Sequence, residues 1–395
     1  MSARLISRNA DLERLQDEGY EVEVRSGLLL LRSIPYVTAR REVARGALVS
    51  SLTLNGERTQ RPDDHQVWFA GEQPCNRDGS HLTGVNVRAG KQSLCPGVDV
   101  DFQFSSKPSG GYADYHAKMT AYADILSHQA RAIDPDATAR TFRPIPATEE
   151  ESVFLYTDSA SSRAGIAAVS EKLAMRRIAI IGLGGTGAYV LDQVTKTPVQ
   201  EIHLFDGDLF LQHNAFRAPG AASLETLLSK LFKVDYYAQI YGRMRRGIVP
   251  HAEHINDATV AQLKDFEFAF ICVDKPAVRR LVAEFLIARS VPFIDAGMEL
   301  ELISEEAAII GTARTTLVES GRSDHFFRHV STEESVVDDL YKSNIQVADM
   351  NALNAMMAVI KWKKFCGFYQ DIYKERQSAY ALNAHQLTRD ETDAS

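Results

Sequence analysis

The sequence predicts an α/β protein with a doubly wound, mainly parallel sheet, preceded by a separate N-terminal α+β domain. Apolar strands alternate with amphipathic helices through the C-terminal part of the chain, which is typical of parallel sheets with helices on both faces. The N-terminal part instead has several β-like segments followed by one long helix. Three prolines and little apolar periodicity mark a linker between Pro135 and Thr148. We therefore expect one domain over residues 1–150 and another over residues 151–395.

Composition and charge exclude several classes of protein. The 395 residues suffice for two domains of roughly 100–200 residues each, and 45% hydrophobic and 24% charged residues are typical of a globular protein. The net charge of −8 disfavours binding to nucleic acid or to an anionic membrane. No apolar run approaches the ~20 residues of a membrane helix, and the first residues lack the apolar core of a signal peptide. We therefore expect a cytoplasmic protein with no nucleic-acid or membrane partner.

The N-terminal elements follow from the hydrophobic pattern. Residues 1–20 place four leucine and isoleucine side chains roughly on one face, which predicts an amphipathic helix. The next segment alternates, becomes a short apolar run and ends at a proline, as a strand does. Turn residues such as Asn55-Gly56 separate the strands that follow. The expected strands span residues 21–37, 47–54, 65–71 and 97–105, and the expected helix spans residues 112–133.

The C-terminal elements alternate in type. Strands are expected at residues 176–185, 201–208, 266–274 and 291–297, and helices at residues 162–174, 187–196, 225–244 and 275–290. Residues 307–318 predict an additional antiparallel strand. A polar stretch from Glu319 to Lys342 then leads to a long helix from about Asn344 to Phe368. We expect the polar tail after this helix to be frayed.

A glycine-rich loop, Gly182-Leu183-Gly184-Gly185-Thr186-Gly187, joins an expected strand to an expected helix. Glycines allow a tight turn and a close backbone approach, while the helix N-terminus offers N–H groups and a positive dipole to phosphate. Asp206 ends the next strand nineteen residues beyond Gly187, where a carboxylate can hold ribose hydroxyls. The loop therefore predicts a Rossmann-like nucleotide site formed by Gly182, Gly184, Gly185, Thr186, Gly187 and Asp206. Users of NAD, FAD and ATP share these features, so the loop alone leaves the nucleotide open.

Charged residues beyond the second strand favour ATP. Asp208 would be an awkward extra negative charge in a dehydrogenase, but carboxylate oxygens hold Mg²⁺ against phosphates. Asn214 and Arg217 bring an amide and a cation towards the same crevice, and Lys233 follows on the next helix. Asp274 ends a later strand at the carboxyl edge of the sheet, where ligands of open α/β sheets bind, although it could instead cap the helix after it. Together these groups suit the charge stabilisation of a nucleotidyl transfer.

This ordered set of motifs resembles the ThiF/MoeB family of adenylating enzymes, which are related to the ubiquitin-activating E1 proteins. The shared pattern is GxGGxG, then DxD, NxxR, a lysine, and an aspartate at the end of a later strand. The resemblance covers about Ser159 to Phe368 and implies the adenylation fold of that family, with ATP and Mg²⁺ as cofactors.

The resemblance also implies roles for single residues. Asp206 is similar to the ribose ligand, and Asp274 to the residue that holds Mg²⁺ with ATP. Arg163, in the segment SSRAGIA, is similar to an upstream arginine that reaches the phosphates, often from the neighbouring subunit. Lys230 is a rival to Lys233, but the pattern FKVDYYA favours Lys233. The expected catalytic residues are Arg163, Arg217, Lys233 and Asp274, and the expected nucleotide-binding residues beyond the loop are Asp206, Asp208 and Asn214.

Two features common in this family are missing. Many members carry paired CxxC motifs for a structural zinc, whereas the four cysteines here, Cys75, Cys95, Cys272 and Cys366, are scattered, so no structural zinc is expected. Many members also form a thioester on a cysteine after the adenylation half, but no cysteine lies between Asp274 and the last helix. Either the chemistry stops at the acyl-adenylate, or a hydroxyl in the polar stretch serves, with His325 or His329 as base.

The N-terminal domain has no motif that indicates a mechanism. Its position before segments such as GLGGTG and HNAFRAPG resembles bacterial ThiF-type proteins from operons that also encode ubiquitin-like and E2-like proteins. The resemblance implies a ubiquitin-like protein with a C-terminal glycine as partner, a possible E2-like partner, and a homodimer. The N-terminal domain would then either bind a protein partner or serve stability and dimerisation.

Two other functions stay open from the sequence. A NAD-dependent oxidoreductase would explain the loop and Asp206, but would leave Asp208, Asn214, Arg217 and Lys233 unexplained. A noncatalytic scaffold would bind nucleotide or partner without turnover.

Overall fold

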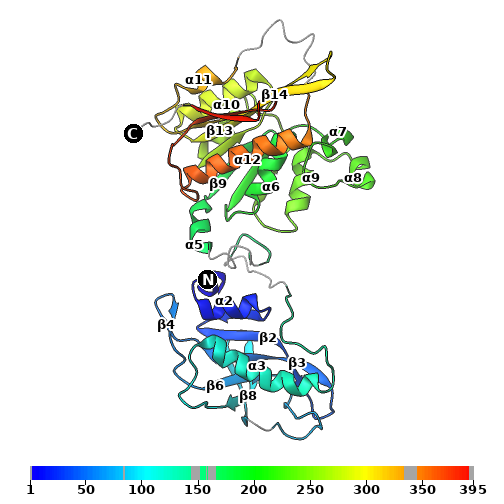
Figure 1. The fold of residues 1–395 in the computed structure, drawn as a ribbon, viewed down its shortest axis with the longest axis vertical. Helices are drawn as coiled ribbons and strands as arrows, with labels where there is room; N and C mark the ends of the chain where they lie inside the picture. The colour runs from blue at the N-terminus through cyan, green and yellow to red at the C-terminus, as the bar shows by residue number, and fades with distance from the viewer. Residues whose placement is uncertain are drawn as a thin grey trace. The chain divides into compact units, whose positions relative to one another are not determined.

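The computed structural model describes residues 2–82, 85–143, 152–156, 158, 166–332 and 345–390. The chain divides into two compact units, one made of Met1–Ser152 and Tyr156–Ala168, the other of Val153–Leu155 and Val169–Ser395. Each unit has its own sheet, helices and buried apolar core (Figure 1).

The N-terminal unit is a six-stranded antiparallel sheet with helix α3 packed against it (Figure 1). Its strand order is β1-β2-β3-β6-β8-β7. Leucines of α2 and of the strands form a core with the apolar face of α3. The elements are α1 (Ser2–Ser7), α2 (Ala10–Asp17), β1 (Glu21–Arg25), β2 (Leu28–Val37), β3 (Val43–Ser51), β4 (Leu54–Asn55), β5 (Arg58–Thr59), β6 (Gln66–Ala70), β7 (Asn86–Cys95), β8 (Val98–Ser105) and α3 (Tyr115–Arg131).

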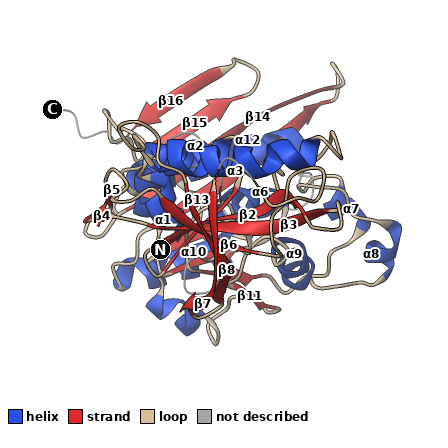
Figure 2. Cartoon of the chain, turned by 90° about the horizontal axis from the view of Figure 1, so that it is seen from below, coloured by secondary structure: helices blue, strands red, loops and turns tan. Residues whose placement is uncertain are grey.

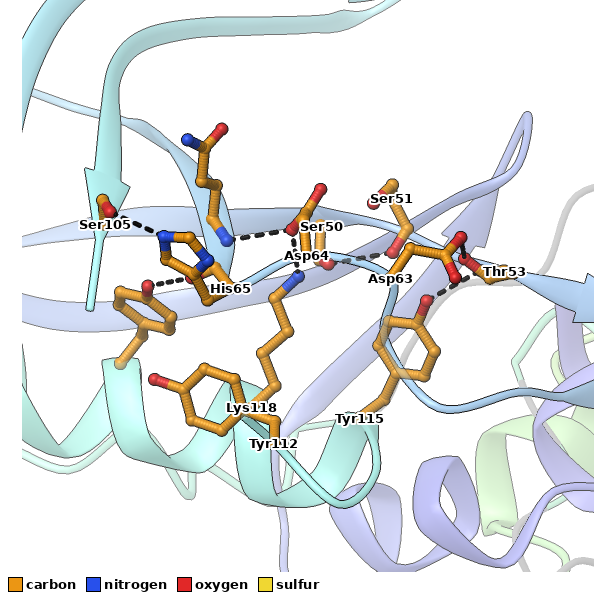
Figure 3. A network of polar contacts seen from close by, with 12 residues as sticks. Ser50, Ser51, Thr53, Asp63, Asp64, His65, Ser105, Tyr112, Tyr115 and Lys118 are labelled. Atoms are coloured by element: carbon orange, nitrogen blue, oxygen red, sulfur yellow. Dashed lines mark hydrogen bonds and ion pairs between the residues drawn. The ribbon is translucent and has the colours of Figure 1, made fainter. Parts of the chain in front are cut away.

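A buried lysine ties α3 to the loop that precedes β6. The Lys118 side chain is fully buried, and its ammonium group donates to Asp64 Oδ1 at 2.9 Å (Figure 3). Burial lowers the pKa of Lys118, while the Asp64 carboxylate opposes this shift. Tyr115, one turn earlier on α3, accepts a hydrogen bond from the Thr53 backbone N–H at 2.7 Å. The helix is thus held to the sheet by polar contacts as well as by apolar packing.

Three expectations for this unit are wrong in detail. The single N-terminal helix is two helices, because the Asn9 side chain donates to the Leu5 carbonyl at 2.7 Å and competes with helical hydrogen bonding. The segment expected as one strand over residues 21–37 is two antiparallel strands, β1 and β2, and β2 continues through Pro35, which follows a register shift in the pairing with β3. Strand β7 was not expected, because it is polar and lies at the edge of the sheet.

The C-terminal unit confirms the expected fold class. Its eight-stranded sheet has the order β11-β10-β9-β12-β13-β14-β15-β16, and the first five strands are parallel. The strands are β9 (Arg177–Ile181), β10 (Glu201–Phe205), β11 (Ile248–His251), β12 (Phe268–Ile271), β13 (Phe293–Ile303), β14 (Ala308–Val318), β15 (Gln377–Ala381) and β16 (Gln386–Asp390). The helices are α5 (Ala167–Ser170), α6 (Gly185–Val194), α7 (Gln212–Ala215), α8 (Leu224–Leu228), α9 (Lys233–Tyr241), α10 (Pro276–Ala288), α11 (Phe326–His329) and α12 (Ala348–Phe365), with 3-10 turns η1 (Glu171–Leu173) and η2 (Val260–Asp265).

Helices cover both faces of this sheet, as a doubly wound fold requires. One buried cluster joins α6, α9 and α12 to alternate residues of the central strands, such as Ile178 and Ile180 of β9. The other cluster joins α10 and η2 to the intervening residues, Ala179 and Ile181. Because the central strands are buried on both faces, their sequences are continuous runs of apolar residues. In Figure 2, α12 lies along one side of the C-terminal sheet.

Several C-terminal expectations are corrected. The helix expected over residues 225–244 is two helices, separated at Lys230, whose φ is +48°, and by the backbone bond from Phe210 N–H to Leu231 O at 2.8 Å. The expected frayed tail contains β16 and is preceded by β15, so the sheet gains two antiparallel strands. Residues 307–318 do form an antiparallel strand, as predicted. Among the described residues, no helix is long and apolar enough to cross a membrane.

Candidate active site

The glycine loop connects β9 to α6 at the carboxyl edge of the parallel strands. Gly182 has a φ of +88°, and a Cβ there would lie 2.7 Å from Cys272 O, so the loop passes close to the end of β12. A Cβ at Gly187 would lie 1.9 Å from Gly182 O. A Cβ at Gly184, the residue directly before α6, would meet no atom of the described chain within 4 Å. Two glycines therefore allow the turn to close, and the third faces open space where a ligand can approach.

The glycine loop is stabilised by a contact with helix α12, near the C-terminal end of the described chain. Thr186 Oγ1 donates to Asn351 Oδ1 at 3.0 Å, and both side chains are buried. A Cβ at Gly185 would lie 2.2 Å from the Asn351 Cγ. Helix α12 thus packs directly on the first turn of α6. Sequence reasoning did not single out Asn351, because nothing local distinguishes it from other asparagines in a helix.

Asp206 contacts the backbone of the glycine loop. Its carboxylate is buried and accepts from the Leu183 N–H at 2.7 Å and from the Asp208 N–H at 2.9 Å. The Asp206 backbone N–H donates to the carbonyl of His251 on β11 at 3.3 Å. The residue therefore connects the glycine loop to the end of β10, which is where a ribose-binding carboxylate is expected in this fold.

Lys233 joins the two aspartates. Its buried ammonium group donates to Asp208 Oδ2 at 2.7 Å and lies 3.3 Å from both oxygens of Asp206. The hydrogen bond from Lys233 is the main reason that the pKa of Asp208 is lowered, and His254 and Lys275 lower it further. Lys230, in contrast, is exposed on the turn before α9. The contacts with these two carboxylates are thus made by Lys233.

Asn214 and Arg217 carry buried hydrogen-bond donors without partners. Asn214 Oδ1 accepts from the Leu211 N–H at 2.8 Å and so caps the short helix α7. Its Nδ2 atom, and the Nε atom of Arg217, are buried and have no hydrogen-bond partner among the described residues. A buried unpaired donor costs about 1–3 kcal/mol, and a bound acceptor would remove that cost. Phosphate and carboxylate oxygens are suitable acceptors.

Asp274 lies on the exposed turn between β12 and α10. Arg279 stabilises this turn, because its guanidinium group donates a hydrogen bond to the Val273 carbonyl at 2.8 Å. The guanidinium of Arg279 also lies 3.0 Å from Asp295, which is fully buried and accepts from Arg314 at 2.7 Å. Sequence reasoning missed this triad, although an aspartate inside the apolar run VPFIDAG was a usable signal.

The structure brings some of the predicted residues together by direct contacts. Gly182 to Gly187, Asp206, Asp208 and Lys233 form one connected group, Asn214 and Arg217 follow on the same loop, and Asp274 lies on the adjacent turn. Arg163 lies outside the described residues. No group of three or more His, Cys, Asp or Glu side chains that could hold a metal by itself occurs in the described parts of the chain.

The candidate nucleophiles differ in their exposure to solvent. Burial raises the pKa of Cys272 and of Cys366, which disfavours the reactive thiolate in both. Among the hydroxyls of the polar stretch and its approach, Thr315 and Thr316 are fully buried in β14, and His325 lies with its Nε2 2.8 Å from the Leu317 carbonyl. Ser320 and Ser331 of the polar stretch are exposed, so their hydroxyls stay candidates for the nucleophile.

Comparisons with known proteins match the two parts of the chain separately. A model of the ThiF family matches residues 159–385, and a model described as a domain of unknown function, DUF6791, matches residues 10–159. No curated protein matches the chain. Two similar solved structures are E. coli MccB with MccA-N7isoASN (17% identity, 60% of this chain and 70% of that chain, TM-score 0.47) and PaaA (16% identity, 57% and 75%, TM-score 0.43). Because the ThiF match spans more than half of the chain, the protein belongs to the ThiF family of ATP-dependent, E1-like adenylyltransferases.

Proposed function

We propose that this enzyme uses Mg²⁺-ATP to adenylate the C-terminal carboxylate of a small ubiquitin-like protein. The observation that carries the proposal is the pair of buried, unpartnered donors on Asn214 and Arg217, next to the connected group of Asp206, Asp208 and Lys233. Both donors can form hydrogen bonds with anionic oxygens. A site that binds ATP and a carboxylate substrate supplies such oxygens. The glycine loop lies within the same group through the bond from Leu183 to Asp206.

The reaction needs positioning and charge stabilisation. A carboxylate oxygen forms a bond to the α-phosphorus while the bond from that phosphorus to the oxygen bridging to the β-phosphate breaks, so pyrophosphate leaves with the electron pair. No proton is transferred, because the substrate carboxylate is already ionised at neutral pH. Arg217 and Lys233, with Arg163 reaching the phosphates from a neighbouring subunit, stabilise the charge that develops on the phosphates.

The residues present suit a magnesium ion bound together with ATP. Mg²⁺ prefers oxygen ligands and keeps most of them from phosphates and water, so one or two protein carboxylates suffice. Asp274 is exposed on the turn beside the glycine loop and is the proposed ligand. When bound, the ion would neutralise phosphate charge.

Lys233 has two roles in this proposal. In the described structure it neutralises Asp206 and Asp208, which lie within 3.3 Å of its ammonium group. A bound triphosphate would compete for the same cation, because a phosphate oxygen is also a strong acceptor. Lys233 thereby stabilises two neighbouring carboxylates in the free enzyme and contacts phosphate in the complex.

The later steps and the assembly belong to the same proposal. The acyl-adenylate would pass to an E2-like partner or to a hydroxyl, since burial raises the pKa of Cys272 beside the glycine loop and disfavours its thiolate. The adenylation domain would span residues 151–395 and act as a homodimer in the cytoplasm. Residues 1–150 would bind a protein partner or support the dimer.

Exchange of labelled pyrophosphate into ATP, in the presence of a ubiquitin-like protein, tests this proposal. Asp274→Asn should reduce the exchange rate by at least about 100-fold, because it removes the carboxylate that holds the metal. Asp390→Asn is the matched control, because Asp390 is an exposed aspartate on β16, at the opposite edge of the sheet from β10. Full exchange in Asp274→Asn would refute the role of Asp274. Binding of ATP by the wild type without exchange would favour a scaffold, and tighter binding of NADH than of ATP would favour an oxidoreductase.

A further inference from the structure

Five large apolar side chains are exposed on one segment of the C-terminal unit. They are Leu211 (41% exposed), Phe216 (78%), Leu224 (67%), Leu228 (70%) and Phe232 (38%), and we call them the apolar rim. Leu224 and Leu228 lie on α8, Leu211 and Phe216 flank α7, and Phe232 directly precedes α9. These three helices are neighbours in both Figure 1 and Figure 2. At 150–250 Å² for a large side chain, the rim exposes on the order of 500 Å², whereas scattered exposed residues need no explanation.

The inner part of the apolar rim is continuous with the candidate active site. Phe216 is bonded to Arg217, and Phe232 is bonded to Lys233. The backbone N–H of Leu211 donates to the Asn214 side chain at 2.8 Å. Each of the three side chains expected at the phosphates, those of Asn214, Arg217 and Lys233, therefore has an exposed apolar residue within the three positions before it in the chain. The rim is thus the border of the site and not a separate surface.

The outer part of the apolar rim is the short helix α8, which packs on the core through Leu227. Helix α8 has five residues, and none of them is buried. Leu224 and Leu228 are four positions apart, so their side chains lie on the same face of the helix. While Leu227 faces the core, the face that carries Leu224 and Leu228 is exposed and can bind another apolar surface.

We infer that the apolar rim binds the C-terminal tail of the polypeptide whose carboxylate is adenylated, and that it selects tails with apolar side chains near the end. This inference rests on the proposed function. The occupant must carry an anionic end for the unpartnered Arg217 Nε and an apolar body for the rim, and a polypeptide C-terminus has both. An extended chain advances about 3.3–3.6 Å per residue, so a tail with its carboxylate near Arg217 passes the adjacent Phe216 within its last few residues.

Charge on this segment agrees with such an occupant. His213, Arg217 and Lys230 bring basic groups to the segment that carries the apolar rim, against Glu225 on α8. Over residues 211–232 the cations Arg217 and Lys230 outnumber the one acidic residue, Glu225, whereas the chain as a whole has a net charge of −8.

Binding of two fluorescein-labelled octapeptides to the full chain tests the inference. Both peptides end in Gly-Gly with a free carboxylate, and they carry either leucine or serine at the third to fifth positions from the end. The site is filled with an ATP analogue whose α- and β-phosphates are bridged by a methylene group, which prevents turnover. Wild type should bind the leucine peptide at least about fivefold more tightly, because its leucines are buried on the rim.

The variants Phe216→Ser and Leu228→Ser should each bring this affinity ratio towards one. Leu387→Ser is the matched control: Leu387 is 57% exposed but lies on β16, at the opposite edge of the sheet, so the ratio should be kept. An unchanged ratio in both rim variants, or no binding of either peptide to wild type, overturns the inference. Rim variants that turn a dimer into a monomer, with the peptide ratio unchanged, would assign the rim to contacts between copies and also overturn it.

The same peptides separate this inference from the proposed function when they are used with ATP itself. A leucine preference in binding without pyrophosphate release refutes adenylation and leaves the tail-binding role in place. Pyrophosphate release with both peptides at equal apparent KM, and no leucine preference, refutes the role of the apolar rim and leaves adenylation in place.

Discussion

Gly184 and Gly187 are three positions apart in one loop, but their surroundings differ. A side chain at Gly187 would collide with the backbone at Gly182 O, 1.9 Å from the new Cβ, whereas one at Gly184 would enter open space. Both glycines belong to the same sequence motif, so the motif alone does not distinguish their roles. The structure separates a glycine needed for the turn from a glycine needed for a ligand.

Alanine substitutions should show this difference. Gly187→Ala should destabilise the protein by more than about 3 kcal/mol, because backbone atoms cannot move away easily. Gly184→Ala should change the free energy of unfolding by no more than about 1 kcal/mol, but should weaken ATP binding at least about tenfold by occupying the space expected for phosphate. Urea unfolding and ATP titration of both variants provide the measurements. Normal ATP affinity in Gly184→Ala would show that no phosphate approaches this glycine.

Contacts between single residues could be predicted from the sequence where both partners belong to the same motif. Asp206, Asp208 and Lys233 follow the glycine loop in a fixed order, and they do contact one another. Asp295 and Asn351 were missed, because their partners come from distant segments and only the folded chain brings them together. A sequence motif shows which residues lie close together along the chain, but it does not show which distant segments come into contact in the fold.

At the scale of elements, an ion pair with the loop before β6 is one of the contacts that hold α3 in place (Figure 3). The ammonium of Lys118 is fully buried, whereas the Asp64 side chain is 45% exposed. Asp64→Ala should therefore destabilise the N-terminal unit by about 1–3 kcal/mol, because it leaves a buried cation without its partner. Lys118→Met should cost less, since it removes the buried charge and keeps the apolar stem. Chemical denaturation followed by circular dichroism measures both, and a larger loss in Lys118→Met would contradict this account.

The elements that sequence reasoning missed have a common cause. β15 and β16 are polar and short, and they exist because β14 offers them an open sheet edge. The break between α8 and α9 depends on Phe210 and Lys233, whose backbones pair with residues outside the helices. The parallel core strands were predictable, because burial on both faces makes them apolar throughout.

At the scale of the whole molecule, the paired carboxylates and buried histidines should make stability depend on pH. Hydrogen bonds from Lys233 and His203 are the main causes that lower the pKa of Asp208 and Glu201 below their ordinary values of 3.8 and 4.5. The stability from these groups is complete above the ordinary values and is lost as pH falls through the lower, folded-state values, because the unfolded chain binds more protons there.

The histidines act in the same direction at higher pH. Burial lowers the pKa of His203 and of His251 from the ordinary value of 6.5, so protonation of the unfolded chain costs stability as pH falls below about 6.5. The thermal unfolding midpoint should decline slightly from pH 7 to 5 and more steeply below pH 4.5. Each half-exposed pair should contribute no more than about 1 kcal/mol, because water screens it. A midpoint that rises as pH falls from 7 to 4 would contradict this sign.

The brace between Thr186 and Asn351 links residues that are 165 positions apart in the chain. On the ribosome, the glycine loop emerges long before the helix that supports it, so a nascent chain holds an unsupported loop until nearly all of the protein has been synthesised. Competence to hold a nucleotide would then be among the last properties the growing polypeptide acquires, and a transcript truncated before α12 would yield a product without it.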